Sequence, residues 1–205
     1  MPWWGVASSL LAPAILIGGW TVAADLQPLP FNAVQRSISA LGAVGMPYRW
    51  IIALTLLGVG VCHATTGIAL RAAAEPGRAL LVIGGIASIL VAVNPQPRHG
   101  GSLVHEGFSL AGVVVMTIWP VAAIRREPGA PFGLRPAAVV ATTGVTLTVL
   151  LWFTIELFHG PELGLAERTV TADQSIWPLL VVLSVLAARQ RAIVPAEQEA
   201  AVRSR

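Results

Sequence analysis

A polar stretch separates two long apolar runs near the middle of the chain: Asn94-Pro-Gln-Pro-Arg-His-Gly-Gly-Ser-Leu-Val-His-Glu-Gly-Phe108. Its prolines and glycines interrupt regular structure, and its last residues open a new helix with Ser102 as the expected N-cap. Because both flanking runs are apolar and long, the stretch predicts a surface loop between two membrane-spanning helices.

Working outward from this loop, six apolar runs are long enough, or nearly so, to cross a hydrocarbon core that needs about 20 helical residues. Backbone groups cannot stay unpaired in lipid, and no run alternates as a barrel strand would, so the spans are expected to be helices. We place them near Ser8–Ala24, Pro47–Leu70, Ala79–Val93, Leu103–Ile124, Ala137–Phe158 and Ile176–Ala188.

The composition agrees with a membrane protein. Apolar residues make up 55% of the chain and charged residues 11%, against roughly 25% charged in soluble domains. The basic residues are all arginines spread between the apolar runs, without a patch or stripe, so we expect no nucleic-acid partner. The single cysteine, Cys62, excludes an internal disulfide and a multi-cysteine zinc site.

The arginines also predict an orientation. In a six-helix threading, one side of the membrane receives Arg71, Arg78, Arg125, Arg126, Arg135, Arg189 and Arg191. The other side receives Arg36, Arg49, Arg98 and Arg168. The positive-inside rule places the richer side in the cytoplasm.

The predicted fold is therefore an all-α membrane protein, a six-transmembrane-helix bundle with both termini cytoplasmic. Residues 1–190 form the transmembrane domain, and residues 191–205 form a disordered cytoplasmic tail. The expected location is the bacterial inner (plasma) membrane, crossed several times. The oligomeric state is left open.

Small residues predict two close helix contacts, because they let neighbouring backbones approach within the membrane. One face carries Gly60, Ala64 and Gly67, and a second carries Ala141, Gly144 and Thr148.

Polar residues collect in the predicted outer loops, over residues 25–47, 94–108 and 159–174, and we expect these loops to meet around a polar pocket on the outer face. The residues expected to bind a ligand there are Ser37, Ser39, Arg98, Glu167 and Arg168.

Three further residues are candidates for catalysis: His105, Glu106 and Glu156. Glu156 is the sharpest of them, because a carboxylate beside the hydrocarbon must find a cation or hold a proton. Pairing with Arg168 or Arg98 is the structural alternative, and general-acid chemistry is the functional one. Glu106 has a structural alternative too, since its charge favours the N-terminus of a helix.

Two other chemistries remain open. His99, His105 and His159 could converge with Glu156 or Asp173 on zinc, but a zincin motif fails because its second histidine would fall at Ser109. We expect no metal and no cofactor.

A serine nucleophile is the second possibility. Ser37 or Ser39 could act with His105 and an acid, although the chain has no Gly-x-Ser-x-Gly elbow.

The chain resembles a known family through three motifs in order: Ser-x-Ser-x-x-Gly at Ser37–Gly42, a proline-rich loop before His105, and Gly-Leu-x-Glu-Arg at Gly164–Arg168. Together they resemble an uncharacterised bacterial integral-membrane family, the domain of unknown function nine-nine-eight. The chain departs from that pattern after the loop proline, where Asn94-Pro-Gln-Pro97 has no acidic residue. The resemblance covers nearly the whole chain and implies no particular activity.

We therefore expect a protein whose outer pocket binds a membrane lipid or small amphiphile. The alternative is a membrane-embedded enzyme acting on a lipid or isoprenoid, by hydrolysis or by acid-catalysed cyclisation. A small transporter is a third hypothesis, disfavoured because the spans carry no charged pair at mid-membrane and no broken-helix repeat.

Overall fold

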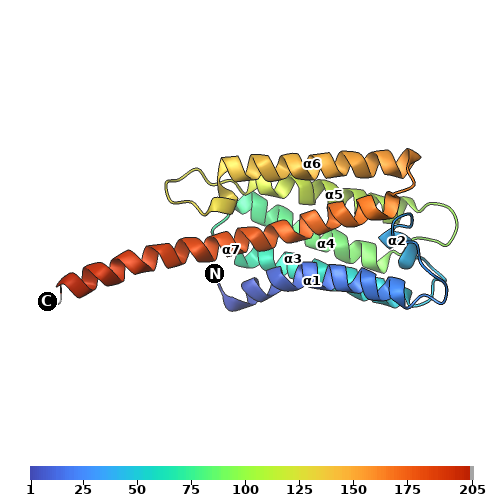
Figure 1. Ribbon diagram of the computed structural model, residues 1–205, viewed down its shortest axis with the longest axis horizontal. Coiled ribbons are helices and arrows are strands. Elements are labelled where there is room, and N and C mark those ends of the chain that lie inside the picture. The colour runs from blue at the N-terminus through green and yellow to red at the C-terminus, as the bar shows by residue number, and fades with distance from the viewer. Residues whose placement is uncertain (204–205) are drawn as a thin grey trace.

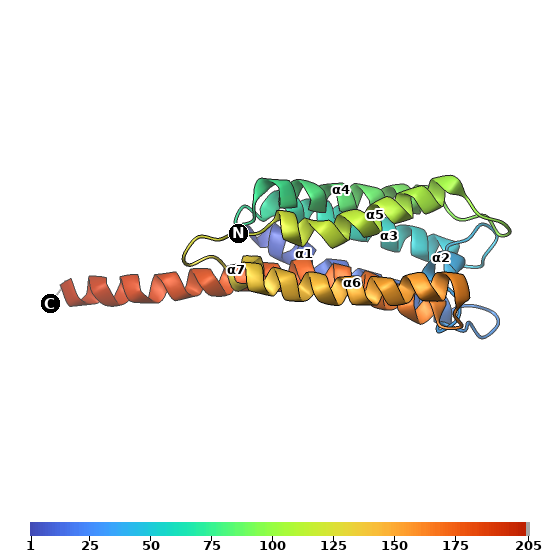
Figure 2. The same ribbon diagram turned by 90° about the horizontal axis from the view of Figure 1, so that it is seen from above.

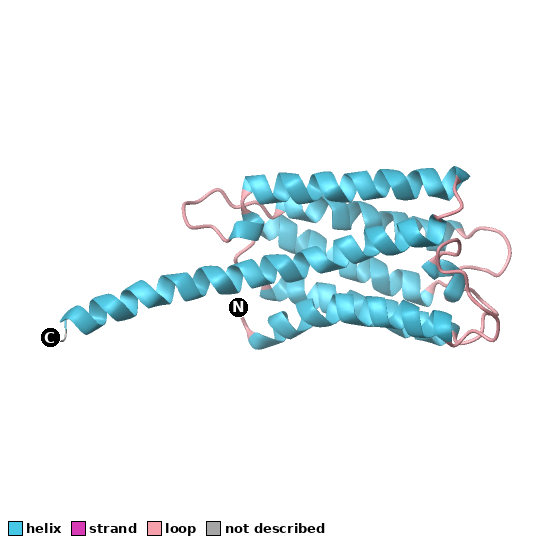
Figure 3. Ribbon diagram, in the orientation of Figure 1, coloured by secondary structure: helices cyan, strands magenta, loops and turns pink. Residues whose placement is uncertain are grey.

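The computed structural model describes the backbone of residues 1–203, and the side chains of that range except those of residues 159 and 192–203. Within these residues the protein is all helical, without a strand (Figure 3). Its elements are α1 (Trp3–Asp25), α2 (Ile38–Leu41), α3 (Arg49–Ala69), α4 (Glu75–Val93), α5 (Leu103–Ala122), the short 3-10 helix η1 (Phe132–Leu134), α6 (Pro136–His159) and α7 (Leu163–Arg203).

Six of these helices, all except α2 and η1, are long and apolar enough to cross a membrane, which confirms the predicted all-α bundle of six spans; the side on which the termini lie stays a prediction. They lie side by side as one elongated bundle, seen from two directions in Figures 1 and 2. Each helix contacts the next in a closed ring, in the order α1, α3, α4, α5, α6, α7 and back to α1.

The bundle has two different ends. Residue 1 and the C-terminal part of α7 lie at one end, here called the termini end (Figure 1). The loops over residues 26–48, 94–102 and 160–162 lie at the opposite end, here called the distal end. The three loops predicted to meet on the outer face therefore do share one end of the molecule.

Close packing of α3 on α4 depends on glycine, as predicted for Gly60 and Gly67. A Cβ at Gly60 would stand 2.5 Å from the Gly85 carbonyl oxygen, and one at Gly67 would stand 2.9 Å from that of Arg78. The second predicted face is wrong. A Cβ at Gly144 would meet no atom within 4 Å, so α6 turns this position away from its neighbours.

The last span begins earlier than hydropathy predicted. We expected residues 159–174 to form a loop, but α7 starts at Leu163 and includes the whole Gly164–Arg168 motif. The polar side chains in this first part of the helix bond to other elements of the bundle, and a hydropathy window cannot register such pairing.

At its other end α7 continues to Arg203. The predicted disordered tail falls largely on residues 192–205, whose side chains lie outside the described part of the structure, and it stays a prediction.

Helix α2 lies inward at the distal end although it is only one turn long. Ile38 and Leu41 are buried in an apolar cluster with Trp20 of α1 and Ile52 of α3. The core therefore holds α2 at a fixed depth and brings Ser37 and Ser39 against the longer helices.

Candidate functional site

The first element of the distal site is the N-terminus of α2, which two side chains cap. Ser37 accepts a hydrogen bond from the backbone N–H of Ala40 at 3.0 Å. The Glu167 carboxylate, from α7, accepts the N–H of Ile38 at 2.5 Å. Capping satisfies donors that a helix leaves unpaired, and a carboxylate also favours the positive end of the backbone dipoles. Glu167 thus joins the last helix to the first loop.

His105 is the second element, and both of its ring nitrogens have partners. Nδ1 lies 2.8 Å from the carbonyl oxygen of Asn94, at the end of α4, and Nε2 lies 3.2 Å from Ser39 Oγ. A carbonyl oxygen can only accept, so Nδ1 carries a hydrogen. In the neutral ring Nε2 is then an acceptor, and the Ser39 hydroxyl can donate to it.

Ser39 has a second acceptor within reach. Its hydroxyl oxygen lies 3.4 Å from Glu167 Oε1, a longer contact than the one to His105. One hydroxyl hydrogen can serve only one of them at a time. Asn94, His105, Ser39 and Glu167 therefore form one continuous series of polar contacts between α4, α5, α2 and α7.

Arg168 fixes the loop in front of α2. Its buried guanidinium donates from Nη1 towards the carbonyl oxygens of Ala33 and Arg36, at 2.8 and 2.9 Å, and towards that of Gly164 at 2.8 Å. Gly164 lies so close to the Ala33 and Arg36 carbonyls that a side chain at this position would collide with them. The Gly-Leu-x-Glu-Arg motif therefore docks onto the segment containing Ser-x-Ser-x-x-Gly.

A cavity of about 20 Å³ opens beside this cluster, between α3, the end of α4 and α5. Ser39, Gln96 and His105 form its polar side, and apolar residues of α3 and α4, among them Ile52 and Leu56, form the rest. A space of this size holds one water-sized group. The cavity accepts one polar group, while the remainder of any ligand must lie outside it.

The other predicted site residues lie apart from this cluster. The Glu106 carboxylate accepts the N–H of Ser102 at 3.1 Å and caps its own helix. Arg98 is exposed, with its side chain beside Gly45. Within the described residues, no hydrogen bond joins the side chain of Glu106 or Arg98 to His105.

Glu156 does not form the ion pair with Arg168 that the sequence suggested. Its carboxylate accepts the N–H of Glu162 at 2.7 Å, and Arg168 turns to backbone carbonyls instead. The pairing failed because Gly160 and Pro161 fold tightly enough for the carboxylate to cap the start of α7, which satisfies it locally.

The residues weighed as possible zinc ligands do not form a group in the described part of the chain. No three His, Cys, Asp or Glu side chains gather there as a metal site would require. His99 is exposed, His105 is engaged as above, and the side chain of His159 lies outside the described residues.

Two members of the distal cluster were missed from the sequence. The Asn94 carbonyl acts through the backbone, so its residue type gives no signal. Gln96 lies within the loop that we singled out, but a lone glutamine does not indicate a cavity wall. His63, further along α3, is buried with its Nδ1 unpartnered among the described residues, and it does not line the cavity.

The three stretches that carried the family resemblance therefore meet at one place, around Ser39, His105 and Glu167. None of the curated proteins and none of the solved structures matches the chain. A family model described as "Protein of unknown function (DUF998)" matches residues 10–184. This match spans most of the chain, so the protein belongs to the DUF998 family.

Proposed function

We propose that the protein is a multi-pass protein of a bacterial plasma membrane that binds a lipid or small amphiphile at its distal end. The observation that carries the proposal is the cavity with polar Ser39, Gln96 and His105 on one side and apolar residues on the other. An amphiphile has the same division between a polar and an apolar part, and ligand sites commonly combine apolar walls with a few placed polar groups.

The size of the cavity limits how such a ligand binds. With about 20 Å³ available, a single hydroxyl or carbonyl group of the ligand enters. Its oxygen bonds to Ser39 or His105, and its chain lies along the outer surface of α3 and α4, where Ala53, Leu56 and Val91 are half-buried.

A photocrosslinking experiment tests the proposal. The probe is a monoacylglycerol with a diazirine in its chain, added to the purified protein in detergent. We expect crosslinked peptides from α3 and α4. Ser39→Ala should raise the probe concentration that gives half-maximal labelling about fivefold, which corresponds to the loss of one hydrogen bond worth about 1 kcal/mol.

Ser109→Ala is the matched control. Ser109 lies on α5 one turn beyond His105 and does not line the cavity, so this variant should label as the unmodified protein does. Labelling confined to α6, or equal labelling of both variants, would contradict the proposal.

A second candidate function is ester hydrolysis, favoured by the Ser39–His105 contact of 3.2 Å and by the anchoring of His105 Nδ1 on the Asn94 carbonyl. Ser39 Oγ would attack the carbonyl carbon of a lipid ester while His105 Nε2 takes its proton. The ester C–O bond then breaks, and the leaving alcohol receives that proton. Water releases the acyl group from Ser39 in the reverse manner.

A fluorophosphonate probe distinguishes hydrolysis from binding alone. It reacts with an activated serine, so a hydrolase should be labelled at Ser39, and Ser39→Ala and His105→Gln should each abolish the labelling. If crosslinking to α3 and α4 is seen but Ser39 does not react, the protein binds without hydrolysis.

A further inference from the structure

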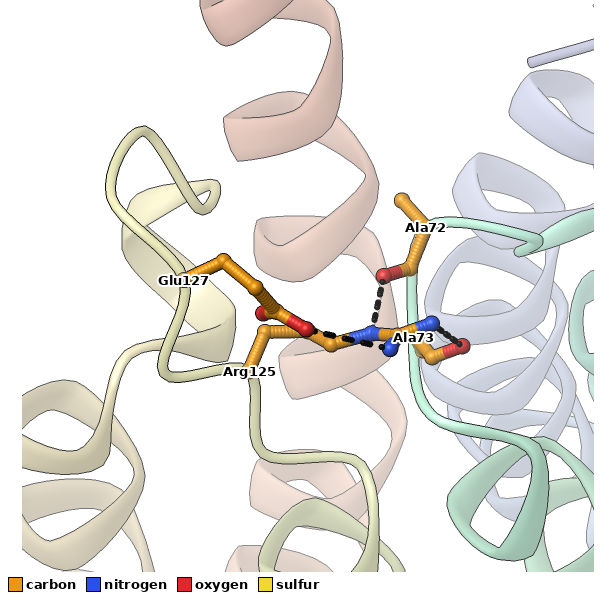
Figure 4. Close-up of polar contacts among 4 residues, drawn as sticks. All are labelled: Ala72, Ala73, Arg125 and Glu127. Atoms are coloured by element: carbon orange, nitrogen blue, oxygen red, sulfur yellow. Dashed lines mark hydrogen bonds and ion pairs between the residues drawn. The ribbon is translucent and has the colours of Figure 1, made fainter.

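A second site lies at the termini end, in the segment that joins α5 to α6. Its fixed point is Arg125, which follows the last turn of α5. Figure 4 shows its guanidinium between two loops. Nε donates to the Ala72 carbonyl at 3.0 Å, Nη2 donates to that of Ala73 at 3.2 Å, and Nη1 lies 3.5 Å from a Glu127 carboxylate oxygen. Arg125 is thereby committed to holding the α5–α6 segment against the α3–α4 turn.

Two further arginines of the same segment keep donors available. Arg135 uses Nε on the Ala130 carbonyl at 2.8 Å, and its two terminal nitrogens have no partner among the described residues. Arg126 is exposed, and its side chain likewise has none within that part of the chain. The guanidinium group is a planar fork that matches phosphate and carboxylate oxygens.

The N-terminus of α6 adds backbone donors to the same place. Pro136 is its first residue, Arg135 makes no side-chain capping bond, and no acidic residue lies in the first turn. The first intrahelical bond of this end comes from Val139 N to the Arg135 carbonyl at 3.0 Å. The N–H groups of Ala137 and Ala138 precede it and remain without a helical partner. Among the described residues, no acidic side chain of the first turn and no capping side chain compensates the positive end of the helix dipole.

These groups surround a cleft of about 660 Å³, here called the arginine cleft, lined by Arg125, Arg126, Glu127, Pro128, Gly129, Arg135, Pro136 and Ala137. Three cations and one anion stand around it. We propose that the arginine cleft binds a phosphate group through Arg126, Arg135 and the N-terminus of α6.

Two sources can supply the phosphate: the headgroup of an anionic phospholipid or a soluble phosphate compound. The position of the cleft favours the lipid. It lies where two membrane spans end, and Phe132 and Val140, which are close in sequence to its lining residues, are 68% and 69% exposed. Val140 lies one turn along α6 from the cleft, so an acyl chain can follow that helix while its phosphate stays among the arginines. Juxtamembrane arginines attract anionic lipids for the same electrostatic reason.

Thermal unfolding of the full chain in detergent tests the proposal, with three probes titrated separately: short-chain phosphatidylglycerol, short-chain phosphatidylcholine and inorganic pyrophosphate. We expect phosphatidylglycerol to raise the unfolding temperature at lower concentration than phosphatidylcholine. In the double variant Arg126→Gln/Arg135→Gln, the phosphatidylglycerol concentration that gives half of the maximal rise in unfolding temperature (the midpoint) should increase at least tenfold. The loss of two charge-assisted hydrogen bonds implies a change of this size.

Arg71→Gln is the matched control, because Arg71 is an exposed arginine of the same end that does not line the cleft. It should leave the midpoint unchanged. Pyrophosphate alone can also stabilise the protein. If the double variant loses that stabilisation and the two lipids have equal midpoints, the cleft binds a soluble phosphate compound.

Equal midpoints for both lipids together with no effect of pyrophosphate would overturn the proposal. The proposal would also fail if Arg71→Gln raised the phosphatidylglycerol midpoint as much as the double variant does. If the double variant does not fold, the salt dependence of lipid binding by the unmodified protein still tests the proposal. Its preference for phosphatidylglycerol must fall as salt rises, and a preference that salt leaves intact also overturns the proposal. None of these outcomes depends on the distal cavity, so the two proposals can fail separately.

Discussion

Arg168 places a guanidinium inside a helix that spans the membrane. Acceptors for its donors and a nearby opposite charge lower the cost of such a group. The carbonyls of Ala33, Arg36 and Gly164 accept from Nη1, Nη2 is buried without a hydrogen-bond partner among the described residues, and the adjacent Glu167 supplies the opposite charge. Trp20 and Phe31 rings stand 6.0 Å from the guanidinium carbon. Arg168 therefore holds three parts of the distal end together.

Replacing Arg168 by Met should lower the free energy of unfolding by about 3 kcal/mol or more, because it removes bonds to a charged donor and leaves buried carbonyls unpaired. The measurement is a denaturation curve in mixed detergent micelles. Arg36→Met is the control. Arg36 is exposed and stacks at 4.7 Å on Phe31, so its loss should cost at most about 1 kcal/mol. Equal losses in the two variants would refute the anchoring role of Arg168.

At the same scale, sequence reasoning named three residues that the fold brings into contact, but not their partners. Ser39, His105 and Glu167 were all candidates, because polar residues beside apolar runs stand out. Their bonds to Asn94 and Ile38 run through backbone atoms, which residue type does not reveal. Glu156 was assigned a distant cation because its cap, the Glu162 N–H, is likewise a backbone group.

Among the elements, hydropathy located all six spans, since lipid demands long apolar helices wherever the chain crosses. It misplaced the start of α7 by treating Glu167, Arg168 and Asp173 as loop residues. Asp173 accepts a bond from Thr146 of α6 at 2.5 Å, and the other two bond to the first loop. Once such groups are paired inside the bundle, the helix can extend through them. That pairing depends on the tertiary fold, which a sequence window does not contain.

The docking of α7 on the first loop predicts contrasting effects of two glycine substitutions. Gly164→Ala should destabilise the protein by about 1–3 kcal/mol, because its new Cβ meets the Ala33 and Arg36 carbonyls and the elements must separate. Gly144→Ala also lies in a membrane span but meets no atom within 4 Å. It should be neutral or stabilise by up to about 1 kcal/mol through helix propensity. Thermal unfolding of both variants decides, and a neutral Gly164→Ala would show that the close contact is not required.

Across the whole molecule, the two ends divide the chemistry. The distal end holds a hydrogen-bonded cluster beside a small cavity, and the termini end holds a cleft in which Arg126 and Arg135 have donors without a partner among the described residues. An even number of spans places the start of α1 and the C-terminal part of α7 at one end, as Figure 1 shows, but the bundle would have the same shape in either orientation. Only the charges of the loops distinguish the two faces.

Seven arginines lie at the termini end, over residues 71–78, 125–135 and 189–191, and four lie at the distal end. Each basic residue near an anionic inner leaflet contributes about 1 kcal/mol, so the difference favours a cytoplasmic termini end. Cysteine labelling tests this in a Cys62→Ala background, with new cysteines at the exposed positions His99 and Pro128. A membrane-impermeant maleimide should label His99→Cys in intact bacterial cells, and Pro128→Cys only after permeabilisation. The reverse pattern would invert the orientation and place the arginine cleft outside, whereas labelling of both positions in intact cells would exclude the six-span threading itself.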